Sequence, residues 1–335
     1  MIVIFGGYGV FGSLVAKELA GLPLRIAGRD ARRAEVVADV SDPASCARAL
    51  EGARVAVSCA GPFSEMTLAL PEACLAAGVH YVDIADDRGW FSRLRGMSDR
   101  FRSRGLTAAC GCSTLPGISG ALALVAAERL KDIERARVTL FIGNRNPKGT
   151  AAVDSAAMQL GRRFEAPQGT LVGFRGREVV DLPPPFGPRG VYDFDSPELD
   201  LFPELIGVRE VRLKVGFESR MATASLAGMS YLGPGLGVPL SRAILPMARL
   251  ASRFGHSGGY AKVELWGEGR SEASIGAARE GQRMAALPGA FVARDLYEGN
   301  LEARGTVTSY EAIGARPLLE RIAAAGYDLL DSRDA

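Results

Sequence analysis

Three glycines close to the N-terminus have the spacing of a phosphate-binding turn. Gly7, Gly9 and Gly12 match G-x-G-x-x-G, directly after the apolar run 1–5 and before 13–19, where apolar residues recur at helical spacing. In such a turn the first glycine permits a tight bend, the second lets the backbone approach a pyrophosphate, and the third lets a helix pack closely on a strand. The helix N-terminus then offers N–H groups to the phosphates. The predicted phosphate contacts are Gly7, Tyr8, Gly9, Val10, Phe11 and Gly12.

A second strand, 22–27, ends in Gly28, Arg29 and Asp30. A carboxylate at this point receives the ribose 2′-hydroxyl of NAD, whereas a guanidinium suits the 2′-phosphate of NADP. Because the strand ends in glycine and Arg29 follows, we expect NADP(H) as the cofactor. The alternative is that Asp30 takes the ribose and the nearby arginines belong to a solvated helix start.

Two further strand ends should contribute to the same cofactor site. Residues 35–40 predict a short third strand that ends at Asp39 and Val40, beside the adenine. Residues 54–60 predict a fourth strand, and ligands in such sheets bind beyond the carboxyl ends of the strands. The segment beside the nicotinamide is therefore predicted to comprise Ser58, Cys59, Ala60, Gly61, Pro62 and Phe63.

Carboxylates gather where a fifth strand, 79–84, should end. Asp83 and Asp86 are the candidate proton donors, with Tyr81 or a bound water behind them. The alternative is that carboxylates here, Asp87 among them, cap the helix around Trp90. Histidine is another possible catalytic residue, but His80 lies at the start of this strand and is interpreted as structural. Nothing in the sequence marks Cys59 or Cys112 as an activated thiolate.

The order of strands and helices predicts an α/β fold with an N-terminal Rossmann domain, that is, a doubly wound parallel sheet complete by residue 117. The second half has alternating apolar strands at 135–143, 171–174, 211–217 and 261–266, which predict an α+β domain on a mostly antiparallel sheet. We expect residues 1–117 to form the cofactor domain and 118–304 a substrate and dimerisation domain. Residues 305–335 should pack back on the first.

The other segments of the second half are less regular. Residues 150–163 predict a helix, 182–188 a proline-rich connector, and 271–294 a mainly helical stretch interrupted at Pro288. The stretch 226–254 is apolar, but glycines and prolines interrupt it and Arg242, Arg249 and Arg253 recur, so it is not a membrane span. Two interpretations remain open for it: a packed pair of helices, or a lid over an apolar substrate.

Composition excludes several classes of protein. The chain has 335 residues, 47% of them hydrophobic and 23% charged, and a formal net charge of +2 without a long basic run, which argues against a nucleic-acid partner. Five cysteines without C-x-x-C spacing and two histidines provide no four-ligand zinc pattern, so we expect reduced thiols and no metal. No signal sequence precedes the first strand, which predicts a cytoplasmic protein.

Several stretches together resemble the saccharopine dehydrogenase-like NADP-binding oxidoreductases. They are GGYGVFG (6–12), AGRD (27–30), SCAGPF (58–63), GVHYVDIADD (78–87) and GCSTLPGIS (111–119), with a weaker similarity near the C-terminus. The resemblance implies an NADP-dependent oxidoreductase whose second, sheet-based domain supplies the substrate site and often a dimer contact. It does not imply saccharopine as the substrate.

The leading hypothesis is therefore an NADPH-dependent oxidoreductase that reduces a C=N, C=O or activated C=C bond of a small or lipid-like substrate, working as a homodimer. An amino-acid-type substrate would need cations for its carboxylate, and candidates are Arg145, Lys148, Arg162 and Arg163. The alternative is a non-catalytic NADPH-binding sensor or assembly protein, because the second half has no obvious catalytic triad, metal set or acid/base pair.

Overall fold

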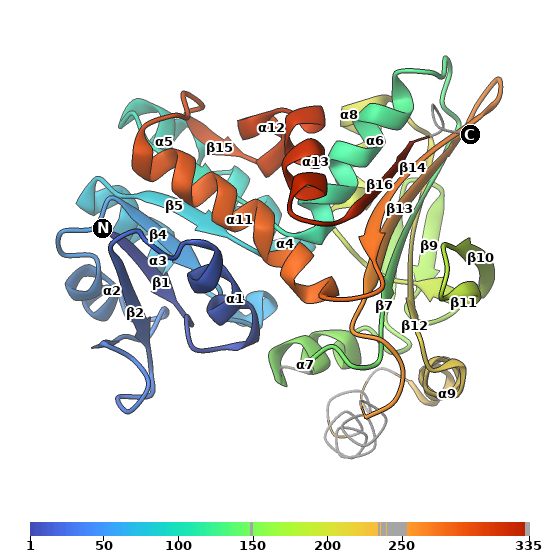
Figure 1. Ribbon diagram of the computed structural model, residues 1–335, viewed down its shortest axis with the longest axis horizontal. Coiled ribbons are helices and arrows are strands. Elements are labelled where there is room, and N and C mark those ends of the chain that lie inside the picture. The colour runs from blue at the N-terminus through green and yellow to red at the C-terminus, as the bar shows by residue number, and fades with distance from the viewer. Residues whose placement is uncertain (148–149, 234, 236–238, 240–252, 332–335) are drawn as a thin grey trace. The chain divides into compact units, whose positions relative to one another are not determined.

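The computed structural model describes residues 1–147, 150–233, 235, 239 and 253–331. The chain divides into two compact units (Figure 1), one made of Met1–Ile118 with Ala285–Leu318 and the other of Ser119–Met284 with Leu319–Ala335. Each unit is built on its own sheet of seven described strands. The sequence predicted that residues 305–335 return to the first unit, whereas this division assigns 285–318 to the first unit and 319–335 to the second.

The first unit contains a parallel sheet in the order β15-β6-β5-β4-β1-β2-β3. All of its pairings are parallel, which confirms the predicted doubly wound sheet. β15 comes from the C-terminal part of the chain and pairs with β6, Gly305 opposite Thr107. The strands are β1 (Ile2–Phe5), β2 (Leu24–Gly28), β3 (Val36–Val37), β4 (Val55–Ser58), β5 (His80–Asp83), β6 (Thr107–Ala109) and β15 (Gly305–Val307).

The third strand is shorter than predicted. β3 ends at Val37, and Asp39 lies in a turn where its Oδ1 accepts hydrogen bonds from the backbone N–H and the hydroxyl of Ser41. Such a local side-chain-to-backbone bond competes with strand pairing. Three residues later Asp42 accepts from the N–H of Ala44 and caps the next helix.

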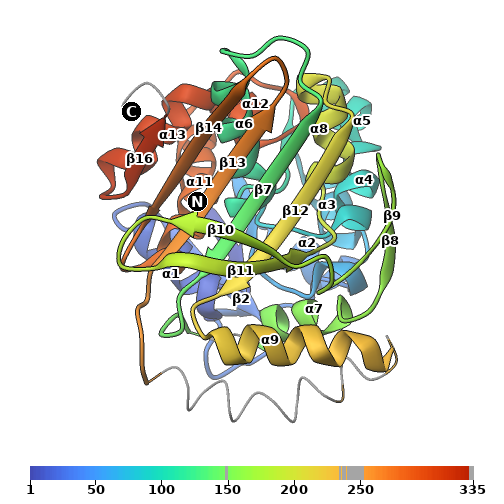
Figure 2. The same cartoon turned by 90° about the vertical axis from the view of Figure 1, so that its right-hand side faces the viewer.

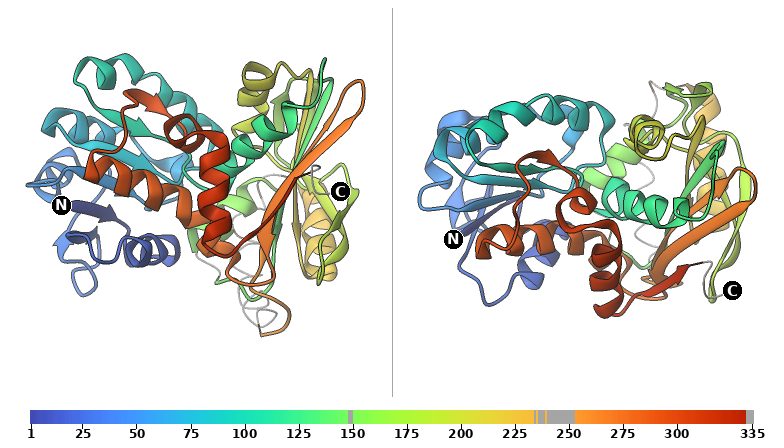
Figure 3. Two further views of the ribbon diagram at one scale, coloured as in Figure 1. Left: turned by 45° about the horizontal axis from the view of Figure 1, so that its top comes forward. Right: turned by 90° about the horizontal axis from the view of Figure 1, so that it is seen from above.

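Helices cover both faces of this sheet (Figure 3), with α11 on the side opposite α4 and α5. β1 is fully buried along its length, as expected for a strand covered on both faces. Ile2 and Ile4 pack with Val15 of α1 and Ala290 of α11 in one apolar core. The helical elements are α1 (Val10–Glu18), α2 (Pro43–Ala49), η1 (Phe63–Glu65), α3 (Ala69–Ala77), α4 (Arg88–Arg95), α5 (Ser98–Ser103), η2 (Thr114–Ile118), α11 (Gly281–Glu298) and α12 (Ser309–Ile313).

The second unit contains a mixed, mostly antiparallel sheet in the order β10-β11-β12-β7-β13-β14-β16, with β12 and β7 parallel. This confirms the predicted fold class. Helices α6 and α8 cover one face of the sheet. The β10–β11 hairpin, which is attached to the edge of the sheet at β12, folds across the other face (Figure 2). There Val180, Val191 and Phe186 pack on Phe141 and Tyr260.

The strands of this unit are β7 (Arg135–Ile142), β8 (Arg163–Ala166), β9 (Gly169–Val172), β10 (Glu178–Leu182), β11 (Gly187–Asp193), β12 (Glu210–Phe217), β13 (Gly259–Trp266), β14 (Arg270–Ala277) and β16 (Asp328–Asp331). Its helical elements are α6 (Ser119–Ala127), α7 (Thr150–Met158), α8 (Glu198–Ile206), α9 (Arg220–Met229), η3 (Ser230–Leu232) and α13 (Ala315–Ala324), the last of which begins in the first unit.

The prediction for residues 271–294 was wrong in two respects. Residues 270–277 form strand β14, in which small residues such as Ala273 hide the two-residue alternation that a strand produces. The helix α11 begins at Gly281 and continues through Pro288 instead of stopping there. The proline-rich segment predicted as a connector is the short turn between β10 and β11.

The apolar stretch 226–254 is described only in part. α9 and η3 extend to Leu232, whereas residues 234, 236–238 and 240–252, with Arg242 and Arg249, lie outside the described residues. The two interpretations of this stretch therefore stay predictions. Within the part of the chain that is described, no helix is both long enough and apolar enough to span a bilayer.

His80 connects two strands of the parallel sheet. Its Nδ1 accepts a hydrogen bond of 3.1 Å from the N–H of Thr107 at the start of β6, which requires the neutral imidazole. Burial, helped by the charges of Arg304 and Arg54, lowers the pKa of His80 to about 4. This contact gives the histidine the structural position that its sequence context predicted.

We predict that His80 makes folding stability depend on pH. Its pKa lies below the unfolded value of about 6.5, so the unfolded chain binds the extra proton and stability falls as pH drops from about 6.5 towards 4. Between pH 8 and pH 5 the wild type should lose about 1 kcal/mol more than His80→Asn in urea unfolding followed by circular dichroism, because solvent screens part of the effect at a side chain that is only partly buried. The control is His256→Asn, which leaves His80 in place. Identical pH dependence of wild type and His80→Asn would contradict this prediction.

Candidate functional site

The turn between β1 and α1 is closed by contacts that leave no room for side chains. A Cβ on Gly12 would lie 2.2 Å from the carbonyl oxygen of Gly6, and a Cβ on Gly9 would lie 3.1 Å from the same oxygen. No side chain caps α1 at Gly9. Because the first N–H groups of a helix have no partner within it, they remain directed at the space beyond this turn. The backbone therefore forms a cradle that fits a phosphate group.

Gly6, which the sequence motif did not include, makes the bend itself. Its φ is +72°, in the left-handed region that favours glycine, and a Cβ there would lie 2.9 Å from the backbone nitrogen of Ala60. Gly7, predicted to permit the bend, has no positive φ, and a Cβ on it would meet the flexible end of Ile26 at 2.7 Å. The consecutive glycines at positions 6 and 7 were the feature of the sequence that could have indicated a bend at Gly6 instead of Gly7.

The end of β2 is organised by Tyr8, which comes from the glycine turn. Its hydroxyl accepts a 3.0 Å hydrogen bond from the N–H of Asp30, and its ring lies so close to Gly28 that a Cβ there would be 2.5 Å from Cε1. Arg33 donates to the carbonyl of Tyr8 at 2.6 Å and stacks on its ring, Cζ lying 4.6 Å from the centroid. Close packing by Tyr8 therefore explains why position 28 carries no acidic side chain.

The two charged residues predicted at the end of β2, Arg29 and Asp30, differ in the contacts that their side chains make. Arg29 is exposed, and no ion pair or hydrogen bond of its side chain is found among the described residues. The Oδ1 of Asp30 accepts from the backbone N–H of Arg32 at 3.0 Å, which stabilises the turn after β2. Asp39, predicted beside the adenine, accepts from Ser41, and these bonds lower the pKa of its carboxyl. Val40 follows it in the same turn.

The segment predicted beside the nicotinamide follows β4. Cys59 donates its N–H to Phe5 at the end of β1, which places Cys59 and Ala60 against the glycine turn. Gly61 is exposed and Pro62 is half-buried, whereas the Phe63 ring is buried, 5.8 Å from that of Trp90. Burial, together with the charge of Asp83, raises the pKa of Cys59 to about 12. Its thiol is therefore neutral at physiological pH.

Asp83 ends β5, and its side chain has no exposed surface. Its Oδ2 accepts from Trp90 Nε1 at 2.8 Å, and its Oδ1 accepts from the N–H groups of Gly111 at 2.8 Å and Ala85 at 3.1 Å. Burial raises the pKa of Asp83, and these donors oppose the effect because they stabilise the carboxylate. The carboxylate thereby joins β5, α4 and the loop after β6.

Two hydroxyls lie beside this carboxylate. The register of β4 and β5 puts Ser58 opposite Asp83, and Tyr81 precedes Asp83 by two residues on the same face. The hydroxyl oxygens of Ser58 and Tyr81 are both buried, and neither has a hydrogen-bond partner of acceptable geometry in the described structure. Burial and then the charge of Asp83 raise the pKa of Tyr81. The two hydroxyls and the Asp83 carboxylate therefore form a buried polar group at the ends of β4 and β5.

The neighbouring acids have separate functions. Asp87 accepts a 2.7 Å hydrogen bond from the N–H of Trp90 and caps α4, so the alternative of a helix cap holds for this residue. Asp86 is in contact with solvent, yet desolvation by the surrounding protein, followed by the charge of Asp87, raises its pKa to about 6. A carboxyl with that pKa and access to solvent can exchange a proton near neutral pH.

The remaining candidates do not gather into a second site with these residues. Cys112 is fully buried, and burial followed by the charge of Asp83 raises the pKa of its thiol. Arg145, Arg162 and Arg163 are exposed, and Lys148 lies outside the described residues. Within those residues no three histidine, cysteine or carboxylate side chains are grouped as a metal ion would require.

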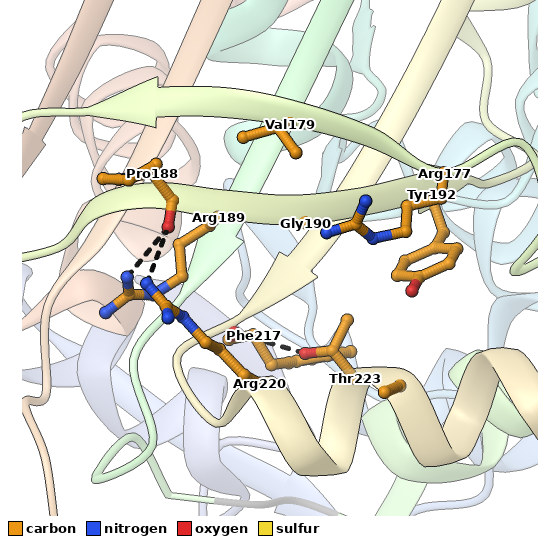
Figure 4. Close-up of a pocket in the computed structure, with 10 residues that line it drawn as sticks. Arg177, Val179, Pro188, Arg189, Gly190, Tyr192, Phe217, Arg220 and Thr223 are labelled. Carbon is orange, nitrogen blue, oxygen red and sulfur yellow. Dashed lines mark hydrogen bonds between the residues drawn. The ribbon is translucent and has the colours of Figure 1, made fainter.

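A different set of arginines, which the sequence analysis did not single out, surrounds a pocket of about 370 Å³ in the second unit. Arg177, Arg189 and Arg220 line it (Figure 4). They are far apart in sequence, and only the β10–β11 hairpin and α9 bring them together, so no motif could have indicated them.

Comparison with known proteins agrees with the first half of this description. Residues 2–108 match the family model described as saccharopine dehydrogenase NADP binding domain. The match confirms the predicted resemblance over these residues and supports a nicotinamide dinucleotide as the cofactor of this domain. No curated protein sequence matches the chain.

A solved structure shares the fold, and a second one is less similar. Saccharopine dehydrogenase (L-Glu forming) from Saccharomyces cerevisiae is 11% identical with a TM-score of 0.69, and the match covers 98% of this chain and 99% of that one. An amine dehydrogenase from Mycobacterium smegmatis is 13% identical with a TM-score of 0.49, covering 93% and 96%. The yeast enzyme therefore shows that both units of the chain follow a known architecture.

We predict that Asp83→Asn lowers the free energy of unfolding by about 2–3 kcal/mol, because an amide cannot accept from all three N–H donors without turning its own NH₂ towards one of them. Urea unfolding followed by circular dichroism measures the loss. The matched control is Asp87→Asn, which keeps a residue suited to the cap of α4 and should cost less than about 0.5 kcal/mol. Equal losses in the two variants would show that the buried carboxylate does not hold these elements together.

Proposed function

We propose that this chain, whose residues 2–108 form a saccharopine dehydrogenase-type NADP-binding domain, is an NADPH-dependent oxidoreductase that reduces a C=N, C=O or activated C=C bond. The observation that carries the proposal is the glycine turn, in which the approach of Gly12 to Gly6 leaves backbone N–H groups of α1 as the phosphate contacts. The shared fold of the yeast saccharopine dehydrogenase supports it.

The cofactor preference follows from the end of β2. Arg29 is exposed and forms no ion pair within contact distance among the described residues, although its charge acts on Asp39, and Arg33 is already held against Tyr8. Two guanidinium groups beside a glycine suit a 2′-phosphate, whereas the backbone of Gly28 offers no carboxylate to a 2′-hydroxyl. In this proposal Arg29 binds the 2′-phosphate and Tyr8 with Arg33 forms the surface beside the adenosine.

The reacting end of the site would lie at the ends of β4 and β5. NADPH supplies the hydride when it is bound. The segment 58–63 would lie beside the nicotinamide, and the buried hydroxyl of Ser58 would satisfy one of its polar groups. Of the three residues predicted for proton transfer, Asp86 fits the role of donor best, because Asp83 and Tyr81 have no exposed surface. Asp83 would then position the loop at Gly111.

We predict that the protein binds NADPH much more tightly than NADH and that Arg29→Ala removes this preference. Loss of a charge-assisted contact to the 2′-phosphate should raise the Kd for NADPH about tenfold or more, and the Kd for NADH should change little. The measurement is a titration at fixed salt that follows the fluorescence of the reduced cofactor. Arg48→Ala, at an exposed arginine of α2, is the control.

Each result of that titration has a clear meaning. Equal losses for NADPH and NADH would sink the assignment of Arg29. Binding of neither cofactor would remove the oxidoreductase proposal altogether. Binding of NADPH without its oxidation in the presence of imines, ketones or enoyl thioesters would favour the alternative of a sensor protein.

We further predict that kcat/KM for reduction falls above about pH 6. A donor must be protonated, and Asp86 loses its proton as pH rises through its pKa of about 6. With any imine, ketone or enoyl thioester that is turned over, Asp86→Asn should lower kcat about 100-fold or more and abolish this limb of the pH profile. Asp87→Asn should keep the limb. An unchanged profile in Asp86→Asn would exclude that residue as the donor.

The homodimer, the cytoplasmic location and the lipid-like or amino-acid-type substrate stay predictions of the sequence. The experiments above neither require nor exclude them, because each follows cofactor binding or turnover by the chain as it is.

A further inference from the structure

We propose that the arginine pocket of the second unit binds an organic oxyanion, a phosphate or carboxylate group on an apolar body. The pocket lies between the β10–β11 hairpin and α9, as Figure 4 shows, and its volume is about 370 Å³. That volume accommodates a small organic molecule. The proposal does not depend on the cofactor assignment, because every residue that carries it belongs to the second unit.

Two of the three guanidinium groups are held by a backbone carbonyl rather than by acids. Arg189 Nη1 and Arg220 Nη2 both donate to the carbonyl oxygen of Pro188, at 3.0 and 3.4 Å (Figure 4). Arg177 lies over Gly190, where an added Cβ would be 3.3 Å from its Nε. The hairpin and the first turn of α9 thus direct three cations into one cavity before any ligand binds.

Most of the hydrogen-bonding capacity of these arginines is unused. A guanidinium has five N–H donors, and the structure shows one hydrogen bond each for Arg189 and Arg220. The Nε of Arg189 is buried and has no acceptor among the described residues. A buried donor without an acceptor is costly, so an oxyanion that reaches Arg189 would be bound favourably.

Acids close to these arginines in sequence are bound by other side chains, with the exception of Asp181, which is exposed and lies opposite Pro188 in the hairpin. Glu178, next to Arg177 in sequence, is bound by Arg137 and by Lys214 at 3.0 Å. Asp193, on the same strand as Arg189, is bound by Lys214 at 2.6 Å and by Arg212 at 3.6 Å.

Glu218, two residues before Arg220, is bound by His256 at 2.7 Å. Within the described part of the chain, none of the three pocket arginines forms an ion pair with a carboxylate. Arg177 and Arg220 are exposed and Arg189 is half-buried, so an anion that enters the pocket would meet three cations that have no carboxylate partner.

The other side chains that line the pocket indicate what the uncharged part of the ligand is like. Val179, Tyr192 and Phe217 contribute apolar surface, and the Val179 side chain is 51% exposed rather than packed against protein. Oxyanions of phosphate or carboxylate type match the forked geometry of arginine, and an apolar body would cover these side chains. The pocket therefore selects for an anion that carries an apolar group, over inorganic ions and over neutral apolar molecules.

The test is isothermal titration calorimetry of the full chain with phenyl phosphate, benzoate and benzyl alcohol at constant ionic strength, with and without saturating NADP⁺. We expect phenyl phosphate to bind and benzyl alcohol not to bind. Arg189→Gln and Arg220→Gln should each raise the Kd for phenyl phosphate about tenfold, because each removes a charge-assisted contact. Arg209→Gln, at an exposed arginine outside the lining, should leave the Kd unchanged.

The different probes and variants distinguish a carboxylate ligand from a phosphate ligand, and binding in the pocket from binding elsewhere. Tighter binding of benzoate than of phenyl phosphate would assign a carboxylate ligand to the pocket, and the reverse would assign a phosphate ligand. Binding that disappears with NADP⁺ and is unaffected by Arg189→Gln and Arg220→Gln would place the anion at the glycine turn instead and overturn the proposal. Equal binding of benzyl alcohol would also overturn it. Circular dichroism establishes that each variant is folded.

Discussion

The approach of α1 to the turn after β1 is the constraint on which the first unit depends. Gly12 lies so close to the carbonyl of Gly6 that even one methyl group would force the helix away from the strand. The same turn presses Gly6 on the backbone of Ala60 and sends Tyr8 across Gly28. Displacement of the helix would therefore disturb the ends of β2 and β4 as well as the N–H groups of α1. The proposed cofactor site would therefore depend on how closely three strand ends and one helix are packed.

The buried carboxylate of Asp83 organises the other half of that site. It holds Trp90 and Gly111 by hydrogen bonds, so the helix after β5 and the loop after β6 have fixed positions relative to each other. Its charge also acts on the nearby thiols: burial raises the pKa of Cys59, Cys110 and Cys112, and Asp83 raises each further. One residue thus explains both the order of the loops and the inertness of the cysteines beside them.

The second unit is distinguished by buried ion pairs. The face of its sheet crossed by the β10–β11 hairpin carries interlocking ion pairs, in which Lys214 is fully buried yet meets Glu178 and Asp193. Buried charges are tolerated when each one has a partner, and here Glu178 and Asp193 are both paired with Lys214. The arginines that line the pocket between the hairpin and α9 form no ion pair with a carboxylate of the described residues, which makes this pocket a candidate anion site.

Local spacing within the sequence determined much of the first unit. A buried apolar strand, a glycine turn and an amphipathic helix are each set by residues a few positions apart, so the sequence alone predicted the parallel sheet, the class of cofactor and the turn residues. The same is true of His80, whose place at the start of a strand marked it as structural. The alternation of apolar residues in β12 and β13 likewise predicted a second sheet with one face covered by helices.

Tertiary structure decided what depends on distant parts of the chain. The pairing of β15 with β6, the packing of α11 on β1, the stacking of Arg33 on Tyr8 and the meeting of Arg177, Arg189 and Arg220 join segments that no local pattern connects. Period and spacing report which face of an element is apolar, but not which distant element covers it. Such partners are chosen by shape and charge once the chain has folded, and only the structure reveals them.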